Sequence, residues 1–328
     1  MTRFILRRMV AMVAVLFIIL VITFAIFYVF PANPAIDICG KGCTAQSVAV
    51  IDKQLGLDHP IYVQFWKYVS EIFVGATYGQ GSHTVSCGIP CLGFSYQENV
   101  PVTTLLREHL PVSISIALGA AVIWLLFGVG LGTIAALRKN TWVDKGVTSV
   151  ALGGIALPVF LVGIVLLYIV TAKLNWLPDP YYQSVFQSPL GFVKGLIQPW
   201  VALALVYAAI YVRFTRARLI EVMAEPYVTT ARAKGLRERR VVVHHGLRAA
   251  LTPVVTIFGL DLGGLLGGAV VVETLYGLPG IGQLFILAVG RDDTPVVLGV
   301  TLVAAFFVVV ANLVVDILYA VLDPRVRY

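Results

Sequence analysis

Six long apolar runs, separated by polar segments, set the pattern of the chain. They cover residues 9–30, 111–137, 147–171, 196–211, 251–272 and 295–322. A helix needs about 20 mostly apolar residues to cross the roughly 30 Å hydrocarbon core of a bilayer, and the fourth run is the shortest. No Ala-x-Ala cleavage site follows the first run, which favours a membrane anchor over a cleaved signal peptide. The pattern therefore predicts an all-α integral membrane protein with six transmembrane helices.

The composition agrees with a lipid environment. Of the 328 residues, 59% are hydrophobic and 12% are charged, whereas a soluble domain carries about 25% charged residues. This excess of apolar residues excludes a soluble cytosolic enzyme, a disordered chain and a small disulfide-stapled protein.

The net charge of +7 indicates orientation and not nucleic-acid binding. If the N-terminus is cytoplasmic, 17 of the 24 Lys and Arg residues fall on cytoplasmic segments. Cytoplasmic loops of membrane proteins carry such an excess of basic residues, so we expect both termini in the cytoplasm. The chain then divides into an N-terminus with the first helix (1–30), an extracytoplasmic segment (31–110), a core of five helices (111–322) containing a cytoplasmic loop (213–250), and a tail (323–328).

All four cysteines lie in the extracytoplasmic segment, at Cys39, Cys43, Cys87 and Cys91. An exported, oxidising compartment favours disulfides, with zinc binding and free thiols as alternatives, and three pairings are possible. In the same segment, apolar and aromatic residues recur at helical spacing between residues 61 and 73. We expect one or two short amphipathic helices near the outer membrane surface, forming a self-packed cap, a docking surface for an external partner, or both.

The cytoplasmic loop contains the signals for a short helix. Pro226 suits the first turn of a helix, and Gly235 suits a stop in the left-handed conformation. A helix of two turns is too short to be stable alone in water. A solvated basic loop is the alternative, but the signals at both ends favour a small helix held by another protein.

The fifth apolar run is rich in glycine. Gly259, Gly263, Gly264, Gly267 and Gly268 repeat at Gly-x-x-x-Gly spacing, which allows close contact between helices in lipid. The repeat indicates a pore lining or an interface with another membrane subunit, with ordinary packing inside the chain as the alternative.

Three acidic residues lie in or beside the apolar runs. Asp261 is in the middle of the fifth run, where a carboxylate is costly unless it faces protein or water. A proton relay, a polar contact on a solute path and a hydrogen bond between helices remain open for it. Glu273 follows this run on the outside, where we expect a gate or a contact with an external protein. Asp316 is expected to be structural, and Pro158 is expected to kink the third helix.

The sequence Tyr-Val-Thr-Thr-Ala-Arg-Ala-Lys-Gly at 227–235, followed by His-Gly-Leu-Arg-Ala-Ala-Leu-Thr-Pro at 245–253, resembles the cytoplasmic loop of bacterial ABC importer permeases. It is most similar to the B-type permease of dipeptide and oligopeptide importers. Of the general Glu-Ala-Ala motif, Ala231 and Gly235 fit, whereas Thr229 and Thr230 replace the first two residues. The peptide-importer core, Ala-Arg-Ala-Lys-Gly-Leu, fits closely.

The resemblance extends over nearly the whole chain. Further similar segments lie at residues 31–35, 55–64, 273–280, 290–292, 312–316 and 322–326. The departures from the usual pattern are at 39–43 and 82–91, which look like insertions around the cysteines.

The resemblance implies a type I ABC importer permease fold with an enlarged extracytoplasmic segment between helices 1 and 2. It implies that the loop helix is a coupling helix for an ATPase, with Arg232 and Lys234 positioned to pair with acidic groups. The coupling residues are Tyr227, Thr230, Ala231, Arg232, Ala233, Lys234, Gly235 and Leu236. The translocation path or helix interface is expected at Asp261, Gly263, Gly264, Gly267, Gly268 and Glu273.

The same resemblance implies partners in the bacterial inner membrane and on both sides of it. These are a second, C-type permease, one or two cytoplasmic subunits that bind ATP and Mg, and an extracytoplasmic substrate-binding lipoprotein. The chain has no Gly-x-x-x-x-Gly-Lys-Ser/Thr phosphate loop, so we expect no enzyme activity, cofactor or metal in this subunit.

The implied cargo is a peptide, with a metal chelate, haem or a glycoside as alternatives. An ion-coupled secondary transporter that uses Asp261 is a second hypothesis, but such carriers usually have repeated halves, and no internal repeat is visible. A membrane-embedded hydrolase would need histidines or paired carboxylates within the spans, whereas all five histidines lie in loops or at span edges.

Overall fold

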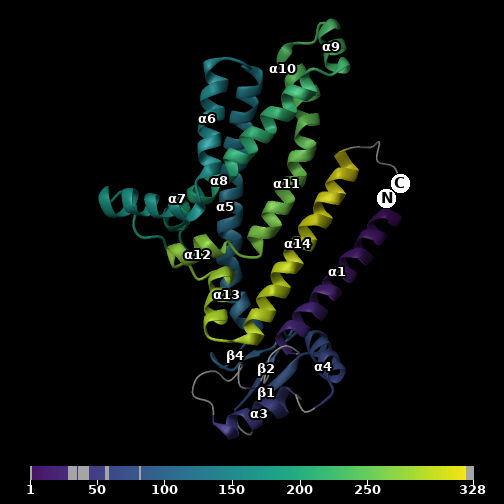
Figure 1. The fold of residues 1–328 in the computed structure, drawn as a ribbon, viewed down its shortest axis with the longest axis vertical. Coiled ribbons are helices and arrows are strands. Elements are labelled where there is room, and N and C mark those ends of the chain that lie inside the picture. The colour runs from purple at the N-terminus through teal and green to yellow at the C-terminus, as the bar shows by residue number, and fades with distance from the viewer. Residues whose placement is uncertain (1, 29–34, 36–43, 56–58, 81–82, 323–328) are drawn as a thin grey trace. The chain divides into compact units, whose positions relative to one another are not determined.

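The computed structural model describes residues 2–28, 35, 44–55, 59–80 and 83–322, and helices make up most of this part. Five helices are long and apolar enough to cross a membrane. They are α1 (Thr2–Tyr28), α5 (Val102–Leu137), α8 (Pro189–Met223), the run of α10 (Glu238–Arg240), η2 (Val241–Leu247) and α11 (Arg248–Leu266), and α14 (Thr294–Leu322) (Figure 1). Two bent pairs of shorter helices also qualify, so the described residues contain five to seven candidate spans.

The predicted third span is broken, not merely kinked. It consists of α6 (Trp142–Ala156) and a second part formed by α7 (Val159–Leu166) and the π-helix η1 (Leu167–Lys173), bent by 100°. Leu157, just before Pro158, has an extended backbone with φ −88° and ψ 124°, because a residue before proline avoids the helical region. Pro158 therefore separates two helices.

The fifth span was predicted to extend to residue 272, which is beyond the end of the observed helix. α11 ends at Leu266, and Gly268 takes a φ of +121°, a conformation that favours glycine. The last predicted residues instead begin α12 (Val270–Tyr276). Together with α13 (Ile281–Gly290), α12 forms the second bent pair, with an angle of 82°.

The predicted fourth span is the middle of a much longer helix. α8 begins where the Ser188 hydroxyl accepts a hydrogen bond from the Gly191 N–H (3.1 Å), with Pro189 in the first turn. This is a favourable helix start. The helix continues through basic residues to Met223, because the end of an apolar run does not end a helix.

The described part of the segment 31–110, predicted to be extracytoplasmic, contains two short helices where one or two were expected: α3 (Ala45–Leu55) and α4 (Ile61–Val74). It also contains strands, so the all-α prediction is wrong here. Strand β1 (Ala76–Gln80) pairs antiparallel with β2 (His83–Cys87), and β3 (Phe94–Ser95) pairs with β4 (Val100–Pro101).

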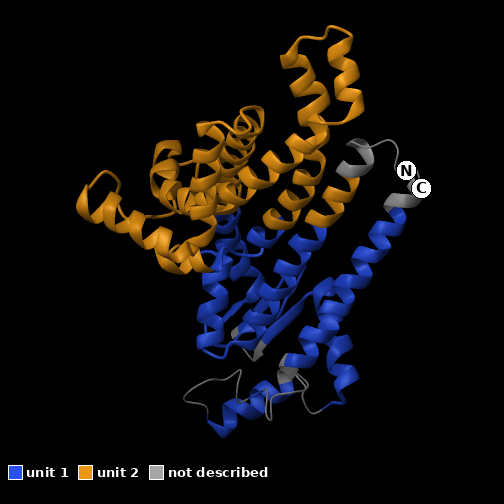
Figure 2. Cartoon of the chain, turned by 45° about the horizontal axis from the view of Figure 1, so that its top comes forward, with its two compact units in different colours: residues 1–114, 263–270, 279–310 blue, residues 115–262, 271–278, 311–328 orange. Residues whose placement is uncertain are grey.

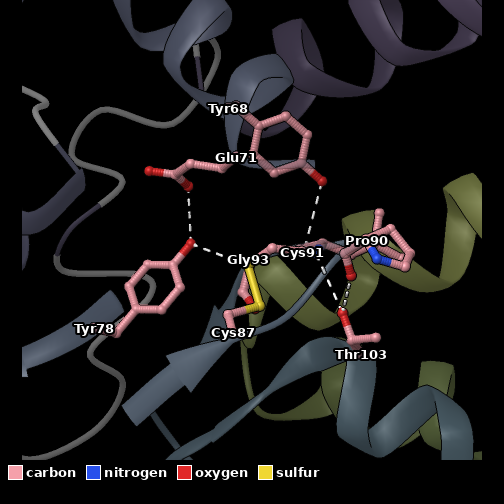
Figure 3. Close-up of a disulfide and its surroundings, with 9 residues drawn as sticks. Tyr68, Glu71, Tyr78, Cys87, Pro90, Cys91, Gly93 and Thr103 are labelled. Carbon is pink, nitrogen blue, oxygen red and sulfur yellow. Dashed lines mark hydrogen bonds between the residues drawn. A yellow bond between two sulfur atoms is a disulfide. The ribbon is translucent and has the colours of Figure 1, made fainter. Parts of the chain in front are cut away.

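A disulfide joins Cys87, the last residue of β2, to Cys91 (Figure 3). Tyr78 of β1 stacks on Phe94 at 5.1 Å between ring centroids, and its hydroxyl donates a hydrogen bond to Glu71 of α4 (2.8 Å). Burial raises the pKa of the Glu71 carboxyl, although the Tyr78 hydrogen bond acts in the opposite direction. The other cysteine candidates, Cys39 and Cys43, lie outside the described residues.

The chain forms two compact units (Figure 2). The first comprises residues 1–114, 263–270 and 279–310, and the second comprises residues 115–262, 271–278 and 311–328. The core of the first unit is made by Val102, Leu106, Ile281, Leu284, Val296 and Val300 from α5, α13 and α14.

In the second unit, α6 packs along α8. Ala151 of α6 is buried with Ala209 and Val212 of α8. A Cβ added to Gly128 of α5 would lie 2.5 Å from Tyr211 of α8, so these helix backbones approach closely. Small residues at such contacts are typical of helix packing in membranes.

Candidate functional site

The predicted short cytoplasmic helix is present as α9 (Pro226–Ala233). Pro226 lies in its first turn, and the helix ends before Gly235, which has a φ of +74°. A Cβ at Gly235 would meet no atom within 4 Å. The left-handed backbone, and not crowding, therefore favours glycine at this position.

One face of α9 packs against the chain itself. Val228 and Ala231 are buried together with Val241 of η2. Tyr227 donates a hydrogen bond from its hydroxyl to the carbonyl oxygen of His245 (3.1 Å). Ala231, one of the predicted coupling residues, is thus turned into this chain and not toward a partner.

The opposite face of α9 is exposed. The predicted coupling residues that are exposed are Tyr227, Thr230, Arg232, Ala233, Lys234 and Gly235. Arg232 forms an ion pair with Glu238 of α10 (Nη2–Oε1, 2.7 Å), so its charge is already partnered within the chain. Leu236 is half-buried.

An ion pair fastens α8, the helix that leads to α9, to the start of α6. Arg216 of α8 donates two hydrogen bonds to the carboxylate of Asp144, one of them from Nη2 to Oδ2 at 2.7 Å. The Asp144 side chain is 4% exposed and also accepts a hydrogen bond from the Asn140 N–H (2.9 Å). Bidentate pairs of this kind fix geometry as well as charge.

Close packing joins α8 to η2 and α11 just before α9. Leu219 of α8 is buried against Ala136 of α5 and Ala250 of α11. A Cβ added to Gly246 of η2 would lie 2.6 Å from the sulfur of Met223. The end of α8 that leads into α9 is therefore packed directly against η2 and the start of α11.

The intramembrane carboxylate lies beside aromatic rings. Tyr211 of α8 donates a hydrogen bond from its hydroxyl to Oδ2 of Asp261 on α11 (2.8 Å). Trp124 of α5 stacks on Tyr207 with 4.8 Å between ring centroids and lies 6.1 Å from the ring of Phe258. Of the alternatives left open for Asp261, the hydrogen bond between helices is therefore present.

The glycines of α11 have different environments. A Cβ at Gly259 would lie 1.8 Å from Val315 of α14, and one at Gly267 would lie 2.9 Å from Ala304 of the same helix. Packing within the chain thus explains both. Gly264 is exposed, with no atom within 4 Å of its added Cβ, whereas Gly263 is buried.

Glu273 does not lie on an accessible surface. Its side chain is fully buried in α12, so it is not offered to an external protein in this conformation. Close by in the sequence, Gly268 lies against Gly282 of α13: an added Cβ would be 2.9 Å from the Gly282 backbone. Glycine is needed there both for its left-handed backbone and for this approach.

Polar contacts connect the β3–β4 hairpin to the turn between α13 and α14. Ser95 donates a hydrogen bond to Asp293, and Arg291 forms an ion pair with Glu98. Burial raises the pKa of the Asp293 carboxyl, while the Ser95 hydrogen bond acts to lower it. The hairpin and this turn are therefore held together within the first unit.

Sequence reasoning missed Asp144, Arg216, Tyr207, Tyr211 and Trp124. Arg216 lies past the fourth apolar run, within the predicted cytoplasmic loop at 213–250. For Asp144 the sequence offered a signal, because an acidic residue in the first turn after the helix-capping Thr141 is typical of a helix start. The aromatic residues offered no signal, because they lie in apolar runs like any core residue. Among the described residues, no three His, Cys, Asp or Glu side chains come together as a metal site.

Comparison with known proteins decides the family. The family model described as the inner membrane component of binding-protein-dependent transport systems matches residues 128–328, and the model of the N-terminal part of these components matches residues 1–117. The chain belongs to this family of ABC importer permeases.

Relatives of this permease match it from end to end. A Brucella abortus (strain 2308) protein that carries the name of a peptide transport system permease is 38% identical over 328 residues, covering 100% of both chains. The glutathione transport system permease protein GsiC of Escherichia coli (strain K12) is 35% identical with the same coverage.

A solved structure shares the fold. The inward-facing MetNI methionine ABC transporter contains a chain that is similar with a TM-score of 0.56 and 14% identity, covering 67% of the permease and 97% of that chain. This likeness supports a helical ABC permease fold.

Proposed function

We propose that this permease forms one half of a peptide translocation path in the bacterial inner membrane and that a C-type permease forms the other half. Relatives named as peptide and glutathione permeases support a peptide cargo, since glutathione is itself a short peptide. A binding protein delivers the cargo from outside, as the family description supports. One or two cytoplasmic ATPase subunits bind the ATP and Mg that drive transport.

Six spans suit this function. They are α1, α5, the bent α6–η1, α8, α11 and α14, with the bent α12–α13 pair entering and leaving on the outer side. Both termini and α9 then lie in the cytoplasm, as the distribution of basic residues favours. Residues 31–110 form the enlarged extracytoplasmic segment, residues 111–322 the permease core, and residues 323–328 the cytoplasmic tail.

The observation that carries the proposal is α9 itself, an eight-residue helix with one face buried on η2 and the other exposed. A helix of this length needs partner surfaces to be stable. The chain covers one face of α9, and a groove of the ATPase covers the exposed face. Closure of the ATPase moves α9, and the packing of α8 and η2 passes this movement to α11. The ATPase grip must differ between its ATP-bound and ATP-free states, because otherwise no population shift results.

Photo-crosslinking tests this contact. A photoreactive residue at Thr230, on the exposed face of α9, should crosslink to an ATPase subunit in the assembled complex. The same residue at Val150, an exposed apolar position of α6, serves as the control and should give no such product. Failure at Thr230 in an assembled complex would contradict the coupling role of α9.

Another solute, such as a metal chelate, haem or a glycoside, would use the same architecture. An ion-coupled carrier would instead use Asp261 and would have no need of α9. Uptake of labelled dipeptides and oligopeptides by the reconstituted complex separates these functions, because an ion-coupled carrier would transport without ATP.

A further inference from the structure

The second unit places a carboxylate within an aromatic cluster in its membrane helices. Asp261 of α11 accepts the hydroxyl hydrogen bond of Tyr211 (2.8 Å), and Trp124 lies between Tyr207 (4.8 Å), Phe258 (6.1 Å) and Tyr211 (6.2 Å) by ring centroids. Three helices, α5, α8 and α11, contribute to it. We name this set of five residues the aromatic–carboxylate cluster.

The Asp261 carboxylate is still available to a ligand. Its Oδ2 is used by Tyr211, and no Lys or Arg among the described residues pairs with it. Asp261 is partly exposed, and its neighbour Leu260 is 50% exposed. A carboxylate in a membrane span must face protein or water, and one hydroxyl does not neutralise its charge.

The aromatic rings of the cluster differ in accessibility. Trp124 is fully buried, and its indole interacts with the Tyr211 hydroxyl, so it is not a donor for a solute. Tyr207 and Phe258 are only partly buried. The cluster thus combines an anionic oxygen with aromatic ring faces.

This combination matches the amino end of a peptide. An ammonium group is attracted both by a carboxylate and by aromatic faces. We propose that the aromatic–carboxylate cluster is a transient subsite for the cationic N-terminal amino group of the transported peptide. The proposal rests on the proposed peptide function. A site on a transport path must attract its solute without retaining it, and a partly exposed single carboxylate suits that requirement.

Two substitutions of Asp261 separate this role from a structural one. Asp261→Asn removes the charge but keeps an oxygen that accepts the Tyr211 hydrogen bond. Asp261→Glu keeps the charge but lengthens the side chain. A cation subsite predicts that Asp261→Asn lowers ATP-driven dipeptide uptake about tenfold, as for loss of one charged contact, and that Asp261→Glu retains more uptake than Asp261→Asn.

The experiment uses the complete complex in proteoliposomes, with radiolabelled dipeptide delivered by the binding protein. Co-elution with the ATPase subunits shows that each variant has assembled, and Leu260→Ala is the matched neighbouring control, expected to transport like wild type. If wild type itself accumulates no dipeptide with ATP, the proposed function fails whatever Asp261 does.

Three results with an active wild-type complex would overturn the subsite. One is that Asp261→Asn transports as well as Asp261→Glu or better. Another is that Tyr211→Phe, which removes only the hydroxyl, reproduces the defect of Asp261→Asn, because the hydrogen bond would then be the function. The third is that a protonophore abolishes wild-type uptake at constant ATP, which would make Asp261 a proton relay.

Discussion

Gly235 shows how one backbone angle ends α9, the proposed coupling helix. Its φ of +74° is in the left-handed region, while open space surrounds the position of a Cβ. A side chain here meets no steric block from neighbouring atoms, so a substitution tests conformation alone. Asparagine visits this region more readily than other residues.

Gly235→Val is therefore expected to shift the end of α9 at a cost of about 1–2 kcal/mol and to lower ATP-driven uptake strongly. Gly235→Asn is the matched control and should retain most of the uptake. Uptake is measured in proteoliposomes, with co-purification of the ATPase as a second readout. Wild-type uptake by Gly235→Val would count against the importance of this helix end.

Asp293 predicts a pH dependence of stability. Burial raises the pKa of Asp293 above its ordinary value of about 4. At a pH between the ordinary and the raised pKa, Asp293 is protonated in the native state but has lost its proton in the unfolded chain. Stability must then fall as pH rises through this window. At a pH below this window, Asp293 is protonated in both states and does not lower the free energy of unfolding.

Asp293→Asn removes the titration, and asparagine is equally favoured just before a helix. Thermal unfolding of the purified protein should therefore lose more stability in wild type than in Asp293→Asn as pH rises from about 4 to 6. Parallel pH profiles for the two proteins would show that Asp293 is not the group responsible.

Residues that act through local backbone preferences could be predicted from the sequence. Pro226 and Gly235 mark the ends of α9 because proline and glycine determine the conformation of their own positions. The partner of Asp261 could not be predicted, because Tyr211 is 50 positions away and the contact depends on how α8 and α11 pack. The burial of Ala231 and the ion pair of Arg232 depend on η2 and α10 in the same way.

At the scale of elements, the Asp144–Arg216 pair ties α6 to the helix that carries α9. Removing one partner of a buried ion pair leaves an uncompensated charge. Arg216→Met is expected to destabilise the protein by about 2 kcal/mol, less than for a fully buried pair because Arg216 is 26% exposed. Denaturant unfolding in detergent measures this change.

The double variant Asp144→Asn with Arg216→Met is the control in a double-mutant cycle. It should be more stable than Arg216→Met alone, since no unpaired carboxylate remains. Strictly additive effects of the two substitutions would mean that the pair contributes no coupling.

The disulfide gives a prediction for the segment that follows the β1–β2 hairpin. Cys87 and Cys91 are four positions apart, so their bond closes a small loop and is expected to contribute about 2 kcal/mol by the loop-entropy relation. Replacing both with serine should therefore loosen this segment locally without preventing membrane insertion. Mass spectrometry without reductant should find neither thiol open to alkylation, and an alkylated Cys87 or Cys91 would contradict the assignment.

Hydropathy located the elements but not their breaks. The apolar run at 147–171 conceals the 100° bend at Pro158, and the run at 251–272 conceals the end of α11 near Gly268. Both breaks depend on backbone angles that an average over apolar residues does not register. The strands β1 and β2 were missed because they are short and depend on pairing with each other.

At the scale of the whole molecule, composition alone excluded a soluble protein, and the loop motif indicated the family that the comparisons then established. The grouping into two units could not be predicted, because each combines segments far apart in the chain, such as residues 1–114 with 279–310. Such contacts are set by packing between helices and not by the local sequence pattern.

The central claim is that this permease provides a path and takes its driving force from partner subunits through α9. The most direct test compares ATP-driven accumulation of labelled dipeptide in proteoliposomes that contain the complete complex with accumulation in those that contain this chain alone. We expect accumulation against a gradient in the complete complex when ATP is present, and none by the single chain. Accumulation by the chain alone in nucleotide-free vesicles would contradict the account.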